Sequence, residues 1–215
     1  MLHPDGSTKM GFEYTLVIPP VLQFDRDAAT GLFKALATSF DLQSLQFVEA
    51  GAVLSGPHII IDIRVGKALS IRSSFAQQIT PEDVLIRQVK EIVGQVKAFF
   101  HIPILILPQI EVRAVWPCLE EDAFTFLARR TSLAEHLDLT GLGPSVGVGL
   151  RIVATQDNVN HFDIHVEPYF PNPANVYVEV KGIFPQVLIQ DDVDPVADTI
   201  RRTYATLEVL ETILQ

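Results

Sequence analysis

The stretch from His161 to Glu167 has an ionisable residue at every second position. Successive side chains of a β-strand point to opposite faces, so the ionisable and the apolar residues of such a strand separate completely. About a hundred residues earlier, the stretch from His58 to Arg64 shows a simpler form of the same alternation. Both stretches predict strands of a sheet with one polar and one apolar face. The residues expected on the polar face of the later strand are His161, Asp163, His165 and Glu167.

The order of the predicted elements repeats along the chain. In the first half, a strand closed by Pro19 precedes a helix, three short strands and a long helix that starts near Pro81. In the second half, Pro117 closes the corresponding strand and Pro195 opens the last helix. Because these signals recur in the same order, the sequence predicts an internally duplicated β-α-β-β-β-α unit.

A unit of this kind forms an α+β fold, with a mostly antiparallel sheet and long helices packed on one face. The first repeat is expected at residues 12–102 and the second at residues 108–215, after a flexible leader at residues 1–11. The two repeats are expected to fuse into one pseudo-twofold domain. Runs rich in β-branched and aromatic residues predict strands at residues 14–18, 44–49, 58–65, 67–73, 110–116, 146–154, 161–167 and 176–181.

Charge and hydropathy narrow the classes of partner. The chain has 16 Lys and Arg against 26 Asp and Glu, a net charge of −10, whereas binding to a phosphate backbone requires clustered basic residues. The longest apolar run, residues 99–107, is far shorter than the roughly 20 residues of a membrane-spanning helix. The N-terminus has no pattern of a signal peptide, and Cys118 is the single cysteine. We therefore expect a cytoplasmic protein without nucleic-acid or membrane partners.

The polar strand face allows two interpretations. Imidazole nitrogens and a carboxylate at His161, Asp163 and His165 could contribute to a zinc or iron site in a metal-dependent hydrolase or lyase. Alternatively, the same side chains form a solvated sheet face and pair across strands. No recognised metal-binding motif is present, so the sequence favours the solvated face and predicts no cofactor. The pairing partners expected in that case are Arg151, Glu179 and Lys181.

Two further stretches contain residue types that also occur in binding sites. The loop at residues 168–175 carries Tyr169 and Phe170 between prolines, and aromatic side chains on an ordered loop can anchor a partner or fold back over the sheet edge. The glycines between Gly141 and Gly149 lead into a predicted strand and not into a helix, so they do not form a phosphate-binding loop.

The second half contains the segments Gly147-Val148-Gly149-Leu150-Arg151, His165-Val166-Glu167-Pro168-Tyr169 and Val178-Glu179-Val180. In these segments it resembles a sporadically distributed bacterial protein family of uncharacterised function, whose members likewise pair two strand-helix-strand units. The resemblance implies no reaction, and it carries no catalytic residues over to this chain. In topology only, the predicted duplication is also similar to the saddle-like TATA-binding domain and to the SecB-type chaperones.

Together these observations predict a non-enzymatic protein-interaction or scaffold domain, chaperone-like in character, that binds a protein partner or forms a homo-oligomer. No residue is assigned a catalytic role. A third hypothesis, a small-molecule pocket between the sheet and the long helices, is favoured only by the apolar fraction of 48%. The residues expected to make the contact are His161, Asp163, His165, Tyr169 and Phe170.

Overall fold

The structure is a computed structural model, and it describes residues 8–20, 23–73, 81–118, 122–131, 149–155 and 157–214. The helices in these ranges are α1 (Arg26–Phe40), α2 (Glu82–Phe99), α3 (Ala123–Thr131) and α5 (Asp194–Leu214). The strands are β1 (Thr8–Val17), β2 (Ser44–Val48), β3 (Gly51–Ser55), β4 (Ile59–Arg64), β5 (Ala68–Ser73), β6 (Leu105–Pro117), β7 (Leu150–Thr155), β8 (His161–Pro168), β9 (Asn175–Ile183) and β10 (Leu188–Ile189).

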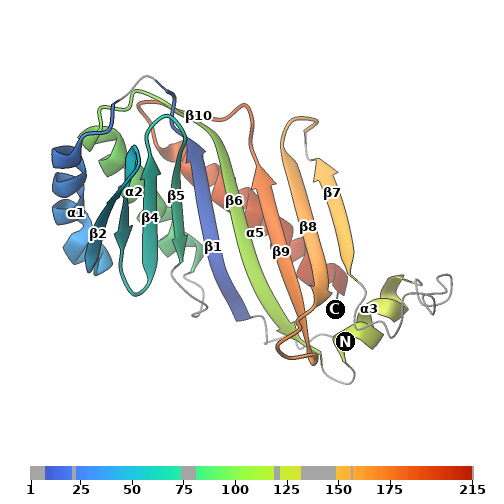
Figure 1. The fold of residues 1–215 in the computed structure, drawn as a ribbon. Coiled ribbons are helices and arrows are strands. Elements are labelled where there is room, and N and C mark those ends of the chain that lie inside the picture. Colours follow the sequence, from blue (N-terminus) through green and yellow to red (C-terminus); the bar gives the residue numbers. More distant parts are fainter. Residues whose placement is uncertain are drawn as a thin grey trace.

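The ten strands form one sheet, and the pairings in the described residues are antiparallel (Figure 1). The strand order is β2-β3-β4-β5-β1-β6-β9-β8-β7, and the short β10 pairs with β6. The predicted α+β fold with a mostly antiparallel sheet is therefore confirmed. Because β1 pairs with β6 at the centre, both halves of the chain share this sheet.

Local sequence determines where helix α1 begins and ends. The Asp25 carboxylate accepts hydrogen bonds from the backbone N–H groups of Asp27 and Ala28, which otherwise lack partners in the first turn. The helix ends at Asp41, which takes the left-handed conformation with φ at 48°. Its buried residues recur at helical spacing and face the core. They are Ala29, Leu32, Leu36 and Phe40.

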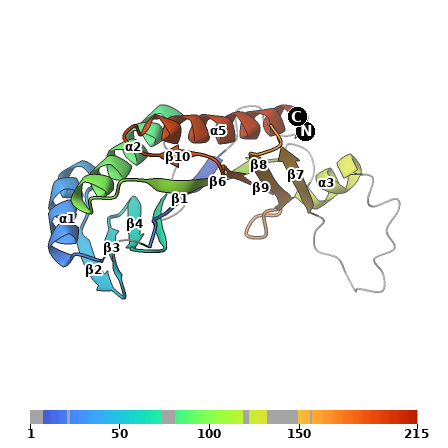
Figure 2. The same cartoon turned by 90° about the horizontal axis from the view of Figure 1, so that it is seen from above.

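Helices α2 and α5 pack against each other, and α5 runs behind β6, β9 and β8 in the view of Figure 1. Figure 2 shows both helices above the arching sheet. The contact between α5 and the sheet includes a buried hydrogen bond of 3.0 Å between the hydroxyls of Tyr14 on β1 and Thr199 on α5. Burial raises the pKa of the Tyr14 hydroxyl, so this group stays protonated and available for the bond.

Helix α5 lies close to the sheet at Gly182 of β9. A Cβ atom added at Gly182 would lie 2.8 Å from a ring carbon of Phe184 and still nearer to the Thr203 hydroxyl of α5. The Phe184 ring in turn makes an edge-to-face contact with Phe162 at 5.9 Å between centroids. The position therefore requires a residue without a side chain.

The first half contains one strand more than predicted. Strand β3 lies between the predicted strands at residues 44–49 and 58–65, and it pairs with both β2 and β4. The turn from β2 to β3 places Ala50 at a positive φ of 51°, a conformation that usually calls for glycine or asparagine. The turn thus lacks the residue types that signal a hairpin, and the predicted count of three strands after α1 is wrong for this half.

Two predicted boundaries are also wrong. Strand β1 begins at Thr8, inside the predicted leader at residues 1–11, because its first residues pair with Ala114 and Val115 of the long strand β6; residues 1–7 lie outside the described part. Strand β6 begins at Leu105, inside the predicted break before residue 108, and its first residues pair with β10. At the position of the predicted break, β6 is irregular: Leu107 has a φ of 52°.

Candidate functional site

The alternation in β8 separates its side chains as predicted. Phe162, Ile164 and Val166 are at most 4% exposed and lie in the core. His161 and Asp163 project from the opposite side of the strand and remain partly exposed. We call this side of the sheet the open face: it carries the residues that alternate with the buried ones in β4, β5, β1, β6, β9 and β8, together with Arg151 of β7, which lies opposite His165.

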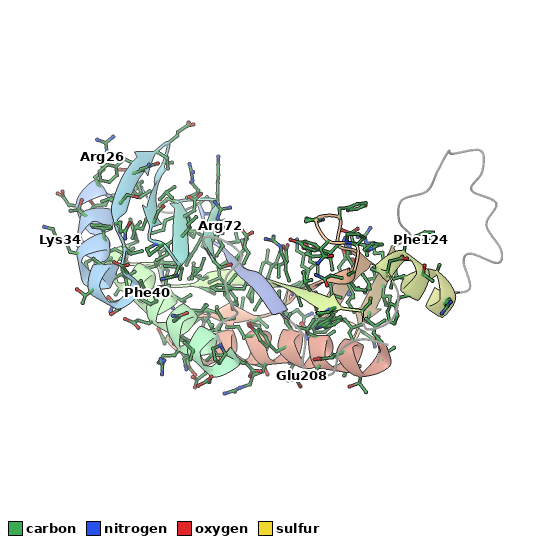
Figure 3. The ribbon with its side chains drawn as sticks, turned by 90° about the horizontal axis from the view of Figure 1, so that it is seen from below. Arg26, Lys34, Phe40, Arg72, Phe124 and Glu208 are labelled. Carbon is green, nitrogen blue, oxygen red and sulfur yellow. The ribbon has the colours of Figure 1, made fainter. Side chains whose placement is uncertain are left out.

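The registers show which residues share the open face, because residues directly opposite on neighbouring strands project from the same side. In Figure 3, Arg72 lies on this side of the sheet and Glu208 lies on α5 on the other side. The open face carries six carboxylates and five Lys or Arg side chains, so it is nearly balanced in charge although the chain as a whole is acidic. These residues are Glu13, Asp62, Glu111, Asp163, Glu167, Glu179, Arg64, Arg72, Arg113, Arg151 and Lys181.

Asp163 is held by Arg151 of β7. The guanidinium donates to both carboxylate oxygens, with Nε–Oδ1 at 2.9 Å and Nη2–Oδ2 at 2.7 Å, and His165 Nε2 lies 3.2 Å from Oδ1. The hydrogen bonds from Arg151 lower the pKa of the Asp163 carboxyl below its usual range. Its contribution to folding is therefore present at neutral pH and is lost as the pH falls through this lowered pKa.

This geometry bears on the metal alternative for His161, Asp163 and His165. Both oxygens of the central carboxylate are occupied by the Arg151 guanidinium. In the part of the chain that the structure describes, no group of three or more His, Cys, Asp or Glu side chains is placed to hold a metal ion. The structure thus places Asp163 in the cross-strand pair with Arg151 that the sequence offered as the second interpretation.

A second cluster occupies the middle of the open face, and sequence reasoning did not single it out. Arg113 of β6 pairs with Glu111 on its own strand and with Glu179 on β9, the latter at 3.6 Å between Nε and Oε2. The Tyr177 hydroxyl donates to the same Glu179 carboxylate at 2.9 Å. Burial and this carboxylate both raise the pKa of the Tyr177 hydroxyl, so it remains a donor at neutral pH.

The centre of the open face brings two glutamates together. Glu13 of β1 lies directly opposite Glu111 of β6, an arrangement that is unfavourable for like charges alone. Each glutamate faces a cation on its other side, because Arg72 lies opposite Glu13 and Lys181 lies opposite Glu111. Ser70 also donates to Glu13 Oε1 at 2.7 Å. The row across four strands is thus compensated by its outer members.

The two predicted aromatic residues lie in the hairpin between β8 and β9. The ring of Tyr169 stacks on that of Tyr177, with 6.4 Å between centroids and 19° between planes. Phe170 is 66% exposed, the highest exposure among the large apolar side chains that the structure describes. The loop therefore does both things that the sequence allowed: Tyr169 folds back onto the sheet while Phe170 projects into solvent.

The five predicted contact residues thus form two groups on one continuous surface. His161, Asp163 and His165 lie along β8, and the loop with Tyr169 and Phe170 follows directly at the end of this strand. Some of the open-face residues that were not predicted could have been found from the sequence. Residues 109–113 of β6 alternate between polar and apolar in the same way as β8.

The third hypothesis expects a small-molecule pocket between the sheet and the long helices, whereas the structure has a hollow between two helices. A surface hollow of about 670 Å³ lies between α2 and the start of α5. Its lining is largely charged, and an ion pair between Lys90 and Asp194 forms part of it. Ligand pockets are usually lined by apolar and aromatic side chains with few polar groups. This hollow therefore does not favour the small-molecule hypothesis.

The ion pair on β8 gives a direct test of the open face. Arg151→Gln is expected to raise the pKa of the Asp163 carboxyl, because Arg151 is the main cause of its lowering. An NMR titration of the side-chain carboxyl carbons measures this shift. Asp157 is the control: its lowered pKa depends mainly on the Asn160 backbone N–H and should not change. An identical Asp163 titration in both proteins would show that the pair does not form in solution.

Comparisons with known protein families and with curated protein sequences give no match to this chain. The resemblance to a bacterial family of uncharacterised function therefore stays a prediction. Among the described helices, none combines the length and the apolar character needed to cross a membrane.

Proposed function

We propose that this chain is a non-enzymatic, cytoplasmic protein-interaction domain that contacts a protein partner or a second copy of itself through the open face and the loop at residues 168–175. One observation carries the proposal: arginine and histidine side chains of the open face keep substantial exposure while the alternating residues are buried in the core. The side chains of Arg113, His165 and Arg151 are 42%, 43% and 66% exposed. A face of this kind offers many polar contacts without further unfolding or rearrangement.

The chemistry of the face supports binding over catalysis. Asp163 and Glu179 are each engaged by an arginine, so their charges are already compensated. A general base or a nucleophile has to be poised within reach of a reacting atom. In the described residues, the hydrogen bond of the His165 ring is to Asp163, a carboxylate that Arg151 already holds. The arrangement therefore favours recognition of a surface.

We also propose that the chain is duplicated and that α2 and α5 are equivalent helices on the same side of the sheet. The strand registers support this proposal. Glu13 and Glu111 are 98 residues apart, the same offset that separates the prolines closing the two predicted strands. Each glutamate faces a basic residue on the outer neighbouring strand, Arg72 on β5 and Lys181 on β9. A pseudo-twofold axis between β1 and β6 would relate these two pairs.

Site-specific photo-crosslinking tests the interaction proposal. A benzoylphenylalanine replacing Gln109, on the open face in β6, is expected to form covalent adducts with the partner or with a second copy in cells. The same group replacing Ala205, which is exposed on α5, is expected to form none. Mass spectrometry of the adducts identifies the crosslinked protein, and sedimentation velocity measures self-association.

The charge-reversal variant Arg113→Glu is the matched control for surface specificity. It removes the pairs with Glu111 and Glu179 and should suppress the adducts formed at Gln109. Adducts that form at Ala205 alone, or a monomer that forms no adducts at either position, would rule out the open face as the contact surface.

A further inference from the structure

The end of the open face where β8 passes into β9 combines aromatic rings with carboxylates. Tyr177 of β9 lies directly opposite Glu167 of β8, and Tyr169 stacks on Tyr177 from the loop. Phe170 follows in the chain and is 66% exposed. We call these four residues, Glu167, Tyr169, Phe170 and Tyr177, the aromatic corner.

The aromatic corner stands on an ordered hairpin. Backbone hydrogen bonds join Tyr169 N–H to the Asn175 carbonyl at 2.8 Å, and Asn172 N–H to the Tyr169 carbonyl at 2.9 Å. The Pro173 carbonyl accepts from Ala123 N–H at 2.8 Å, which ties the loop to the first residue of α3. A loop held in this way loses little conformational entropy when a partner binds to it. The exposed phenylalanine is therefore a preorganised contact.

The charges at this end favour a cation. Glu167 is exposed, and no ion pair is formed by it among the described residues. Asp122, next to the loop at the start of α3, is also exposed, but its carboxylate accepts hydrogen bonds from the backbone N–H and the hydroxyl of Thr125. The guanidinium of Arg113 is engaged with Glu111 and Glu179. A partner therefore meets the exposed Glu167 carboxylate beside the negative faces of the aromatic rings.

We propose that the aromatic corner receives an arginine side chain from a basic segment of the partner protein. The guanidinium would stack on the exposed ring of Phe170 and donate to the Glu167 carboxylate. Arginine fits better than lysine, because its planar group can stack on a ring and bond a carboxylate through two N–H groups at once. This inference deepens the proposed function, on which it rests, by giving the chemical class of the partner.

A labelled peptide tests the proposal without knowledge of the natural partner. The probe is a fluorescein-labelled decapeptide of alternating glycine and arginine, and its binding is followed by fluorescence anisotropy at low ionic strength. The control peptide carries citrulline at the arginine positions, which keeps the planar side chain and removes the charge. The arginine peptide is expected to bind and the citrulline peptide is not, and the affinity should fall as salt is added.

Two pairs of variants separate the aromatic corner from the general acidity of the chain. Glu167→Gln should weaken binding about 3-fold and Phe170→Ala about 5-fold, from the usual size of exposed ion pairs and cation–π contacts. Glu208→Gln removes one carboxylate from α5, and Phe47→Ala removes a 42% exposed ring at the far end of the sheet. Both control variants are expected to bind the peptide like the unchanged protein.

The outcomes distinguish this inference from the proposed function. Equal weakening by Glu167→Gln and Glu208→Gln would show non-specific attraction to an acidic protein and would overturn the aromatic corner. An absence of binding, or binding that Phe170→Ala leaves unchanged, would overturn it as well. In either case the crosslinking at Gln109 decides separately whether the open face makes contacts. Circular dichroism of each variant confirms that a loss of binding is not a loss of fold.

Discussion

Phe162→Ala is expected to lower the free energy of unfolding by about 4 kcal/mol, and Ile61→Ala by about 3 kcal/mol, because each leaves a cavity in a close-packed core. Both side chains are at most 1% exposed, Phe162 in β8 and Ile61 in β4. They lie in opposite halves of the chain, on either side of the central pair of β1 and β6. Since both halves share one sheet, we expect each variant to shift the same single unfolding transition.

Urea unfolding measures this cooperativity with two probes. Trp116 is the single tryptophan and lies buried in β6, so its fluorescence reports on the middle of the sheet. Far-UV circular dichroism reports on the whole chain. The two curves should coincide in both variants. A shift of the dichroism curve in Ile61→Ala without a shift of the fluorescence curve would show instead that the halves unfold separately.

The second large effect is expected at Gly182. Gly182→Ala should destabilise the protein by about 3 kcal/mol, because the new methyl group has no room between β9 and α5. Neighbouring atoms from Phe184 and Thr203 already surround the position, and both side chains are buried. Thermal unfolding followed by circular dichroism measures the loss of stability.

Gly94 provides the matched control for the same substitution. It lies within α2, and an added Cβ atom would meet nothing within 4 Å. Gly94→Ala should therefore stabilise the protein by about 0.5–1 kcal/mol, the usual gain for alanine over glycine inside a helix. If Gly182→Ala were as stable as the unchanged protein, the close approach of α5 to β9 would be wrong.

The sequence predicts those parts of the fold that depend on local periodicity. The apolar spacing in α2 and the alternation in β8 are visible directly, and both elements form where they are expected. Strand β3 was not predicted, because the turn before it has Ala50 at a positive φ and alanine is not a residue type that indicates such a turn. The start of β6 was not predicted, because Pro108 suggests a break in the strand. In the structure the strand continues through Pro108, and the Pro108 carbonyl accepts a hydrogen bond from the Phe184 N–H.

The candidate site shows where prediction from sequence ends. The polar residues of β8 could be identified because they alternate within one strand. The row of Arg72, Glu13, Glu111 and Lys181 could not, because it depends on the register between β1 and β6. That register joins residues 98 positions apart, and no local pattern encodes it. The stacking of Tyr169 on Tyr177 is easier to predict than this row of charges but harder than the alternation in β8, since both tyrosines belong to one hairpin.

The central position of β1 has a consequence for synthesis on the ribosome. The residues that pair with one edge of β1 are those of β5, and this half of the sheet is complete once residue 73 has been made. The other edge pairs with β6, whose last paired residue is Val115. The nascent chain therefore carries an open strand edge along β1 while about forty further residues are translated. An unpaired edge of this kind is where other chains can add. Translation through α2 is thus the interval in which the growing polypeptide most needs protection from its neighbours.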